Sequence, residues 1–267
     1  MVGDHSAELA KKHFKRILVC VLIACWGMAA SSQPIPILVY HRFDSVLPGP
    51  TTVHTAVFDS QLTWLEQHRY RVIPLHVAID VLHNHREISE PTIAITVDDG
   101  HQSVYTEMFP LILKHRIPVT LFIYPSAISN ARYALTWDQI RKMQQSGLVE
   151  VQSHTYWHPN FKQERTRLGV AQYYDFVRLQ LERSRQTLES RLGIKVYALA
   201  WPFGIHDPQL EAAARQAGYQ AAFGYEGGAA GAGCNDFAIP RIPVSDHDTG
   251  SRFLQLLNNQ RSTPGTP

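Results

Sequence analysis

Two adjacent carboxylates follow an apolar run in this chain of 267 residues. Residues 92–97 read Thr-Ile-Ala-Ile-Thr-Val, which is typical of a buried strand, and they lead directly into Asp98, Asp99 and Gly100. Adjacent carboxylates repel each other and must be kept solvated or paired. The carboxyl ends of strands are also where α/β folds build active sites. The alternative is structural, with Asp98 capping the next helix and Asp99 serving as a turn residue.

Two histidines, His154 and His158, follow a second strand-like run over 149–152. A spacing of four places two imidazoles on one side of a single helical turn, where both can reach one cation, and Pro159 ends that turn. Such a pair arises easily by chance in a chain with 14 histidines, so its position at a strand end is the informative feature. Two histidine nitrogens and one carboxylate oxygen leave coordination positions open, as catalytic zinc-like sites do.

A third strand-like run, 198–201, leads into Pro202, Phe203 and Gly204. Trp201 and Phe203 have flat aromatic faces on which a sugar ring can stack, and burial in the core is the alternative for both.

Elements that position these three strand ends can be read from the apolar runs. Several runs are continuous rather than alternating, which is typical of strands buried on both faces of a parallel sheet. Strands alternate with helical patterns, which predicts a parallel sheet or a (β/α) barrel. The expected strands are Ile35–Tyr40, Tyr70–Leu75, Thr92–Val97, Pro118–Ile123, Leu148–Gln152, Val196–Trp201, Tyr219–Phe223 and Phe237–Val244.

Helix boundaries carry recognisable signals. Thr136 and Gln139 form a capping box, and Gly147 lies just past the end of that helix. Asp207-Pro208 marks another start, and Gly218 its stop. A long amphipathic helix is expected over about 168–192, closed by Gly193. Residues 224–233 lack the spacing of phosphate-binding motifs, and we expect a flexible surface loop there.

The N-terminus is typical of a secretory signal. A basic cluster precedes an apolar run over 17–30, which is shorter than the roughly 20 residues of a spanning helix and ends in small residues. We therefore predict a signal peptide over 1–30 and export to the periplasm or cell envelope. Residues 22–25 also resemble a lipobox, which leaves two outcomes open: cleavage near Ala30, or lipidation of Cys25 and membrane attachment. The basic cluster is Lys11, Lys12, Lys15 and Arg16.

The composition bounds the remaining possibilities. An apolar fraction of 45% with 18% charged residues is that of an ordinary globular protein. A net charge of +2, without a basic stretch rich in aromatics after the N-terminus, gives no indication of nucleic-acid binding. Once the signal is removed Cys234 stands alone, so no internal disulfide is expected. We predict one domain over 35–258, a disordered tail over 259–267, and a monomer.

Two of these motifs together resemble those of a known family. Residues 96–100, Thr-Val-Asp-Asp-Gly, resemble the T-F-D-D-G motif of the polysaccharide deacetylases, the NodB-homology family or carbohydrate esterase family four. Residues 154–159, His-Thr-Tyr-Trp-His-Pro, resemble that family's H-[ST]-x-x-H-P motif. The resemblance extends from about Pro36 to Val244, and it implies a distorted (β/α) barrel that removes acetyl groups from a polysaccharide.

The resemblance also implies residue roles. It assigns Asp98 as general base, with Asp99, His154 and His158 as ligands of a divalent metal ion. Zinc suits this donor set, and Co²⁺, Ni²⁺ and Fe²⁺ are chemically acceptable. It places the Phe203 backbone N–H at the developing oxyanion. The aromatic residues expected to contact substrate are Trp201, Phe203, Tyr156 and Trp157.

Two family features are absent from their usual places. The arginine that braces the catalytic aspartate is replaced by Ala200, and no C-terminal Leu-x-His follows to supply a general acid. His41 at the end of the first strand instead resembles the biofilm poly-β-1,6-N-acetylglucosamine deacetylases, whose motifs are circularly permuted. By that likeness His41 is the acid, with His247 as the second choice. Arg241 replaces the brace, or it forms a surface or structural ion pair.

The sequence therefore predicts metal-assisted hydrolysis of N-acetyl groups on a polymer containing N-acetylglucosamine. Two alternatives remain open. One is an esterase acting on O-acetyl groups, and the other is a carbohydrate-binding protein that kept the barrel and lost the chemistry, which Ala200 mildly favours. The polymer is also open between poly-β-1,6-N-acetylglucosamine, peptidoglycan and chitin-type oligomers.

Overall fold

The computed structural model describes residues 34–47, 49–86, 88–231 and 233–259. The predicted signal peptide, Cys25 and the tail beyond 259 lie outside the described residues. Within the described part, no helix is long and apolar enough to cross a membrane.

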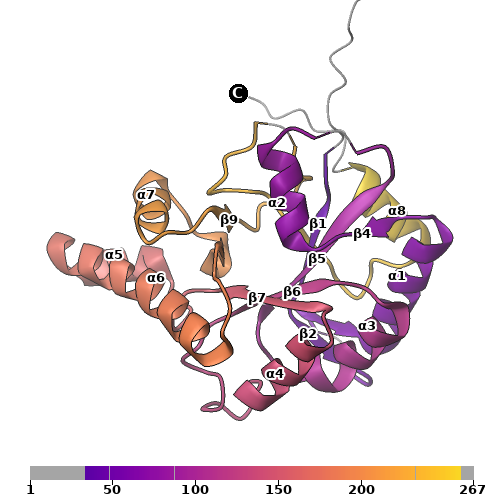
Figure 1. Ribbon diagram of the computed structural model, residues 1–267, viewed down its shortest axis with the longest axis horizontal. Coiled ribbons are helices and arrows are strands. Elements are labelled where there is room, and N and C mark those ends of the chain that lie inside the picture. Colours follow the sequence, from indigo (N-terminus) through magenta and orange to yellow (C-terminus); the bar gives the residue numbers. More distant parts are fainter. Residues whose placement is uncertain (1–33, 48, 87, 232, 260–267) are drawn as a thin grey trace, which may run out of the picture. The chain divides into compact units, whose positions relative to one another are not determined.

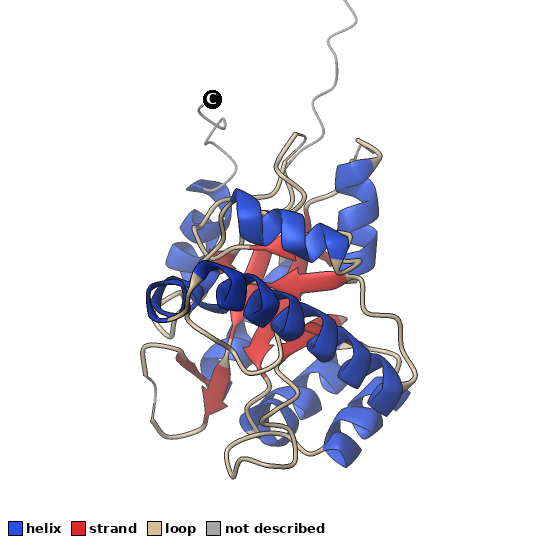
Figure 2. Cartoon of the chain, turned by 90° about the vertical axis from the view of Figure 1, so that its left-hand side faces the viewer, coloured by secondary structure: helices blue, strands red, loops and turns tan. Residues whose placement is uncertain are grey.

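A curled sheet of eight strands forms the centre of the protein, and every paired strand in it is parallel. Seven strands follow the order β10-β1-β5-β6-β7-β8-β9, and β4 pairs with the start of β5. Helices pack around the outside of these strands (Figures 1 and 2). The strands are β1 (Ile37–Tyr40), β4 (Arg71–Val72), β5 (Thr92–Asp99), β6 (Val119–Ile123), β7 (Val149–Ser153), β8 (Ala198–Ala200), β9 (Ala221–Phe223) and β10 (Ile242–Pro243).

The curl brings the two edges of the sheet together. Phe223 at the end of β9 forms a parallel bridge with Ile239, which leads into β10. Ile239 N donates to Ala222 O and Gly224 N donates to Ile239 O, both at 2.9 Å. Because β10 pairs with β1, this bridge joins the edges into a distorted barrel, and the predicted single-domain fold is confirmed.

All eight expected strands exist, but several are shorter than the apolar runs. In the last run, 237–244, the strand is restricted to Ile242 and Pro243, and Pro240, which has no N–H to donate to a neighbouring strand, precedes it. By contrast, β5 runs two residues further than expected and includes both aspartates. Seven of its eight residues are buried, as a strand covered on both faces requires.

The helices follow the boundary signals where the sequence supplied them. Thr136 and Gln139 form both hydrogen bonds of the capping box, and Asp207 caps α7 by accepting from two backbone N–H groups. Gly193 ends α6 in the left-handed conformation. The helices are α1 (Thr55–Gln67), α2 (Leu75–His83), α3 (Phe109–His115), α4 (Trp137–Gln145), α5 (Phe161–Arg167), α6 (Val170–Leu192), α7 (Pro208–Gln216) and α8 (Gly250–Asn259).

Three short elements surround the carboxyl ends of the strands. A small parallel pair, β2 (Arg42–Asp44) and β3 (Thr52–His54), follows β1. A π-helical turn, Val104–Met108, precedes α3, and a 3-10 turn, Pro202–Gly204, follows β8. These segments are where side chains can be aimed at a common point above the barrel.

Candidate metal centre and catalytic pocket

Strand register brings the predicted site residues together. Asp99 pairs with Ile123 on β6, and Ile123 pairs with Ser153 on β7, so His154 emerges beside the two aspartates. On the other side of β5, Tyr40 of β1 pairs with Val97, which puts His41 level with Asp98. Residues from separate parts of the chain therefore converge because parallel strands end at one edge.

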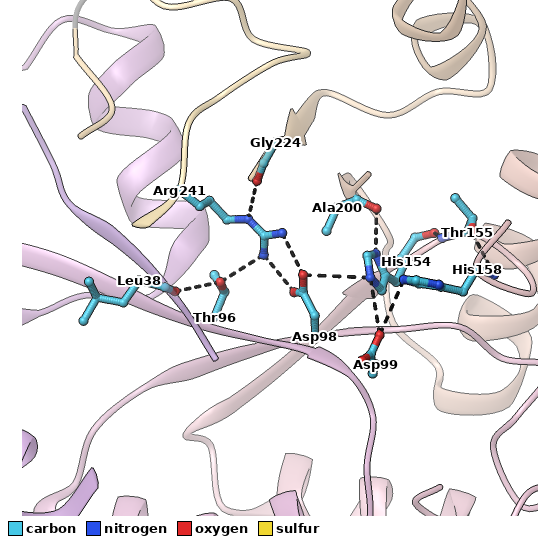
Figure 3. Close-up of polar contacts among 11 residues, drawn as sticks. Leu38, Thr96, Asp98, Asp99, His154, Thr155, His158, Ala200, Gly224 and Arg241 are labelled. Carbon is cyan, nitrogen blue, oxygen red and sulfur yellow. Dashed lines mark hydrogen bonds and ion pairs between the residues drawn. The ribbon is translucent and has the colours of Figure 1, made fainter. Parts of the chain in front are cut away.

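Asp99, His154 and His158 form a cluster suited to a cation. One ligand atom from each lies within 4.8 Å of the others. The Nε2 atoms of both histidines are 3.6 Å from Asp99 Oδ1 (Figure 3). His154 Nδ1 is 2.8 Å from the Ala200 carbonyl oxygen, which can only accept, so Nδ1 carries the proton and the Nε2 lone pair faces the cluster.

The environment keeps the two histidines in the form that binds metal. Burial lowers the pKa of His154 to about 3 and also lowers the pKa of His158, so both imidazoles are neutral near pH 7. Neutral imidazole is the ligand form, because a protonated nitrogen has no lone pair to share. Burial raises the pKa of the Asp99 carboxyl in the absence of a bound cation. Two nitrogens and one carboxylate oxygen fit a divalent ion such as zinc, with coordination positions left open.

Asp98 is held by a fully buried arginine. Arg241 Nη1 donates to Asp98 Oδ1 at 2.8 Å, and Nη2 donates to Oδ2 at 2.7 Å (Figure 3). The guanidinium also donates to Thr96 Oγ1 and to the Gly224 carbonyl oxygen. Burial alone raises the pKa of Asp98, but the charge and hydrogen bonds of Arg241 outweigh it and hold the pKa at about 2. Asp98 is therefore ionised, as a proton acceptor must be.

This geometry places Arg241 where a brace for the aspartate is needed, although it lies 143 residues away in sequence. The contact is possible because β10 and β5 both pair with β1. Arg241 is thus no surface residue, and Ala200 does not leave Asp98 without a brace. Ala200 instead contributes its carbonyl oxygen to His154.

The backbone around the cluster is strained rather than helical. Asp99, Thr155 and His158 have φ values of 75°, 65° and 64°, a region that residues with side chains rarely adopt. The expectation of one helical turn carrying both histidines is therefore wrong. His158 turns back toward His154 because its backbone is left-handed, and the Thr155 hydroxyl accepts from the His158 N–H at 3.2 Å. The rings still converge, with centroids 4.6 Å apart.

A pocket of about 370 Å³ opens above these residues. His41 lines it, and its ring meets the ring of Tyr225 edge to face at a centroid distance of 5.7 Å. The pocket is lined by His41, Arg42, Thr51, Asp98, Asp99, Tyr124, His154, His158, Trp201, Phe203, Gly204 and Tyr225. Every predicted ligand, the predicted base and the predicted acid thus face one space.

Of the two aromatic residues around Pro202 that were expected to contact substrate, Trp201 is buried and Phe203 is exposed. Trp201 is only 1% exposed, and its indole N–H donates to the Phe237 carbonyl oxygen at 2.9 Å, so it has no free face for a sugar and that expectation is wrong. Phe203 is 61% exposed at the pocket rim, 4.7 Å from the His158 ring. Its φ of 57° and its place in the first turn of a 3-10 helix leave its N–H without a partner inside the helix.

Three other predicted residues lie outside the lining of this pocket. Tyr156 stacks under the Arg183 guanidinium at 4.2 Å, and half-exposed Trp157 packs on Phe176. His247, the second choice for the acid, is exposed to solvent. His41, and not His247, therefore lines the same pocket as Asp98.

The pocket residues that the sequence did not single out include Arg42, Thr51, Tyr124 and Tyr225. Tyr124 directly follows β6, a strand-end position that could have identified it. Tyr225 lies in the segment 224–233, which was expected to be a flexible surface loop; most of its described residues form no regular secondary structure, but two of them are buried. Gly224 is buried with its carbonyl oxygen on Arg241, and buried Ala230 exchanges two backbone hydrogen bonds with Ile35. Glycine residues allow the segment to pack closely against the barrel, but a glycine-rich sequence does not by itself predict that packing.

The fold and the site together define a class of protein. A curled parallel (β/α) sheet carries a braced, ionised aspartate beside an Asp-His-His cluster at the carboxyl ends of its strands. This arrangement is that of a hydrolase with a divalent-metal site.

Comparison with known proteins identifies the family. Residues 85–222 match the family described as polysaccharide deacetylase. The matched range covers just over half of the chain, and the chain belongs to the polysaccharide deacetylase family. The family predicted from the two motifs is confirmed.

Curated relatives lie within the same family. The chain is 25% identical over 202 residues to the poly-beta-1,6-N-acetyl-D-glucosamine N-deacetylase of Staphylococcus aureus (strain MRSA252), covering 73% of this chain and 68% of that protein. It is 23% identical over 248 residues to the protein of the same name from Escherichia coli (strain K12), covering 80% of this chain and 37% of the relative. The chain thus spans well under half of the E. coli relative.

Solved structures share the fold. IcaB from Ammonifex degensii superimposes with a TM-score of 0.74 at 25% identity, over 87% of this chain and 99% of that one. The Streptococcus pyogenes deacetylase PplD in complex with acetate gives a TM-score of 0.76 at 22% identity, over 85% and 99% of the two chains.

Proposed function

We propose that the protein is a zinc-dependent N-deacetylase of a polymer containing N-acetylglucosamine, with poly-β-1,6-N-acetylglucosamine as the favoured substrate. The observation that carries this proposal is the pairing of an ionised Asp98, held by Arg241, with the Asp99-His154-His158 cluster in one pocket. The family and the names of the curated relatives support the choice of an amide on an amino sugar.

Asp99, His154 and His158 would hold the metal ion. A divalent cation bound there supplies Lewis acidity that polarises a carbonyl group and makes a water molecule more acidic. The protein contributes the orientation of the donors: the Ala200 carbonyl oxygen fixes the His154 tautomer, and the left-handed backbone of His158 aims its ring inward. Zinc is proposed because two imidazoles and one carboxylate are donors that it prefers.

The side chains around the cluster move the protons. Asp98 takes a proton from the attacking water as the water oxygen adds to the acetyl carbonyl carbon. The Phe203 backbone N–H donates to the oxygen that becomes negative. When the C–N bond breaks, His41 gives a proton to the departing amine, which leaves acetate and a glucosamine unit. His41 is proposed as the acid because it alone of the two candidate histidines lines the pocket.

The polymer is proposed on two grounds. The predicted signal over 1–30 would export the enzyme to the periplasm or envelope, anchored if Cys25 is lipidated, where extracellular polysaccharides are handled. The matched relatives carry the name of a poly-β-1,6-N-acetylglucosamine deacetylase. The exposure of Phe203 in the pocket lining is also compatible with a polymer that enters and leaves the site.

Acetate release from purified protein tests this function. The zinc-loaded enzyme should release acetate from oligomers of β-1,6-N-acetylglucosamine faster than from peptidoglycan or chitin oligomers, and a chelator should stop the reaction. Asp98→Asn should lower turnover at least 1,000-fold, roughly the scale on which acid–base groups contribute, while zinc content stays at the wild-type level. His154→Ala should lose zinc.

The matched control is His247→Ala, because His247 is exposed and lies outside the pocket lining. This variant should keep full activity. Faster release from O-acetylated sugars than from N-acetylated ones would make the protein an esterase. Zinc binding without acetate release from any substrate would make it a binding protein.

A further inference from the structure

A histidine outside the pocket is held between two carboxylates. His206 Nδ1 lies 2.9 Å from Glu211 Oε1 on α7, and His206 Nε2 lies 3.0 Å from Glu226 Oε1 in the segment after β9. His206 itself follows the 3-10 turn that carries Phe203. One imidazole therefore connects the two loops that border the pocket on the β8–β9 side.

Both contacts require a proton on each ring nitrogen. An ionised carboxylate only accepts hydrogen bonds, so His206 can satisfy both partners only as the imidazolium, which has two N–H donors. The hydrogen bond to Glu226, outweighing the opposing effect of burial, raises the pKa of His206, and the contact with Glu211 acts in the same direction. A neutral ring has one N–H and must release one of the two carboxylates.

Glu226 is the partner that would be released. Its side chain is 51% exposed, so water can take the place of His206. The Glu211 side chain is only 16% exposed and also accepts from the Asn235 side chain. Loss of the proton therefore frees the segment after β9 and leaves α7 in place.

One hydrogen bond joins Glu226 to Tyr225 within that segment, and two others attach the segment to Arg241. The Glu226 carboxylate accepts from the Tyr225 N–H at 2.8 Å. The Gly224 carbonyl oxygen accepts from Arg241 Nε at 3.0 Å, and the Gly227 N–H donates to the Arg241 carbonyl oxygen at 3.1 Å. Movement of Glu226 would thus reach both Tyr225 and the arginine that braces Asp98.

Tyr225 lies between His41 and the turn that carries Phe203. On one side its ring meets the ring of His41. On the other side it packs on Gly204, where an added Cβ would lie 2.8 Å from Tyr225 Cβ, closer than real contacts allow. The position of this tyrosine therefore sets the distance between the proposed acid and the Phe203 turn.

We propose that His206, as the imidazolium joining Glu211 to Glu226, is a positioning residue that holds Tyr225 between His41 and the Phe203 turn. The inference rests on the proposed deacetylase function and deepens it by adding a residue that touches no reacting group. The contact is complete below the ordinary histidine pKa of about 6.5 and is lost as pH rises through the raised pKa of His206.

Three other charged groups lie near His206, and two of them pair with each other. Across the small pocket beside it lie Lys162, Arg165 and Asp207, and Arg165 Nη1 forms an ion pair with Asp207 Oδ2 at 3.0 Å. Lys162 is the remaining cation in that lining, and a nearby positive charge disfavours protonation of a histidine in general. The two glutamates that contact the ring directly dominate over it, because they are within hydrogen-bonding distance.

NMR titration and kinetics of the zinc-loaded protein test the proposal with two variants, His206→Gln and Glu226→Gln. Glu226→Gln should lower the titration midpoint of the His206 ring. Both variants should shift the His41 ring resonances, because the Tyr225 ring moves relative to His41.

In the acetate-release assay, His206→Gln should lower kcat roughly tenfold with KM changed less than about twofold, as small displacements of catalytic groups do. It should also remove one alkaline phase of the pH profile.

His115→Gln is the matched control. His115 also bridges two carboxylates, Asp59 at 2.7 Å and Glu66 at 2.8 Å, but it lies on α3 away from the pocket lining. It should leave His41 resonances and kcat unchanged. The proposal is overturned if His206→Gln leaves His41 unmoved, or if the two histidine variants have the same effect. The NMR readout does not depend on turnover, so a protein that releases no acetate would refute the proposed function and not the positioning of His41.

Discussion

At the scale of single residues, the ion pair between Arg241 and Asp98 connects the fold to the proposed chemistry. Both side chains are buried, with 0% and 2% exposure, and the pairing is bidentate. A buried pair of this kind adds little net stability over an apolar pair, but removal of one partner leaves a charge without compensation. The consequences of losing Arg241 should therefore be large for both folding and catalysis.

We predict that Arg241→Met lowers the free energy of unfolding by about 3–5 kcal/mol and abolishes acetate release. Urea denaturation and the acetate assay measure the two effects. Arg178→Met is the control, because Arg178 pairs with Asp175 and Glu182 on the surface at 3.4 Å, and such pairs contribute at most about 1 kcal/mol. Equal destabilisation by the two variants would show that Asp98 does not depend on its brace. Arg241→Lys should be intermediate, since lysine is not a planar fork.

At the scale of elements, the turns after the strands carry the strain of the site. The turn after β8 brings Phe203 to the pocket with a left-handed backbone, and Gly204 follows with φ of 67°. Glycine is needed there for two reasons, the left-handed backbone and the contact with Tyr225. A comparison with a glycine that has the left-handed backbone but no close contact separates the two reasons.

We predict that Gly204→Ala destabilises the fold by more than Gly193→Ala and lowers kcat, whereas Gly193→Ala keeps full activity. Both glycines are left-handed, with φ of 67° and 65°, so each substitution carries a backbone penalty of roughly 1 kcal/mol. Only at Gly204 would the new Cβ collide, because nothing lies within 4 Å at Gly193. Thermal unfolding and steady-state kinetics provide the comparison. Identical effects at the two positions would mean that the contact with Tyr225 has no consequence.

At the scale of the whole molecule, the core of the barrel is built without the metal site. The largest apolar cluster among the described residues extends from the strands to the helices, and it does not include Asp99, His154 or His158. The metal-free protein should therefore remain folded, with zinc adding stability through binding to the native state alone.

We predict that zinc at 100 times its dissociation constant raises the free energy of unfolding by about 2.7 kcal/mol, and that a chelator reverses this gain while far-UV circular dichroism stays native. Asp99→Ala should lose the stabilisation by zinc. Magnesium at the same concentration should stabilise much less, because it prefers oxygen donors to imidazole. If the protein unfolds on chelation, the fold depends on the bound metal ion and this prediction is wrong.

The sequence by itself determined the parts of the protein that depend on local chemistry. Apolar runs predicted the strands, and capping residues predicted several helix ends. The Asp-Asp and His-x-x-x-His motifs predicted the family and the residues of the site. Each of these signals lies within a few consecutive residues. Tertiary structure alone decided the partners that come from distant strands. It brought Arg241 to Asp98, buried Trp201, turned His158 inward without a helix and set Tyr225 against His41. These outcomes follow from how the sheet curls and closes, and such pairings between β10, β1 and β5 leave no local pattern in the chain.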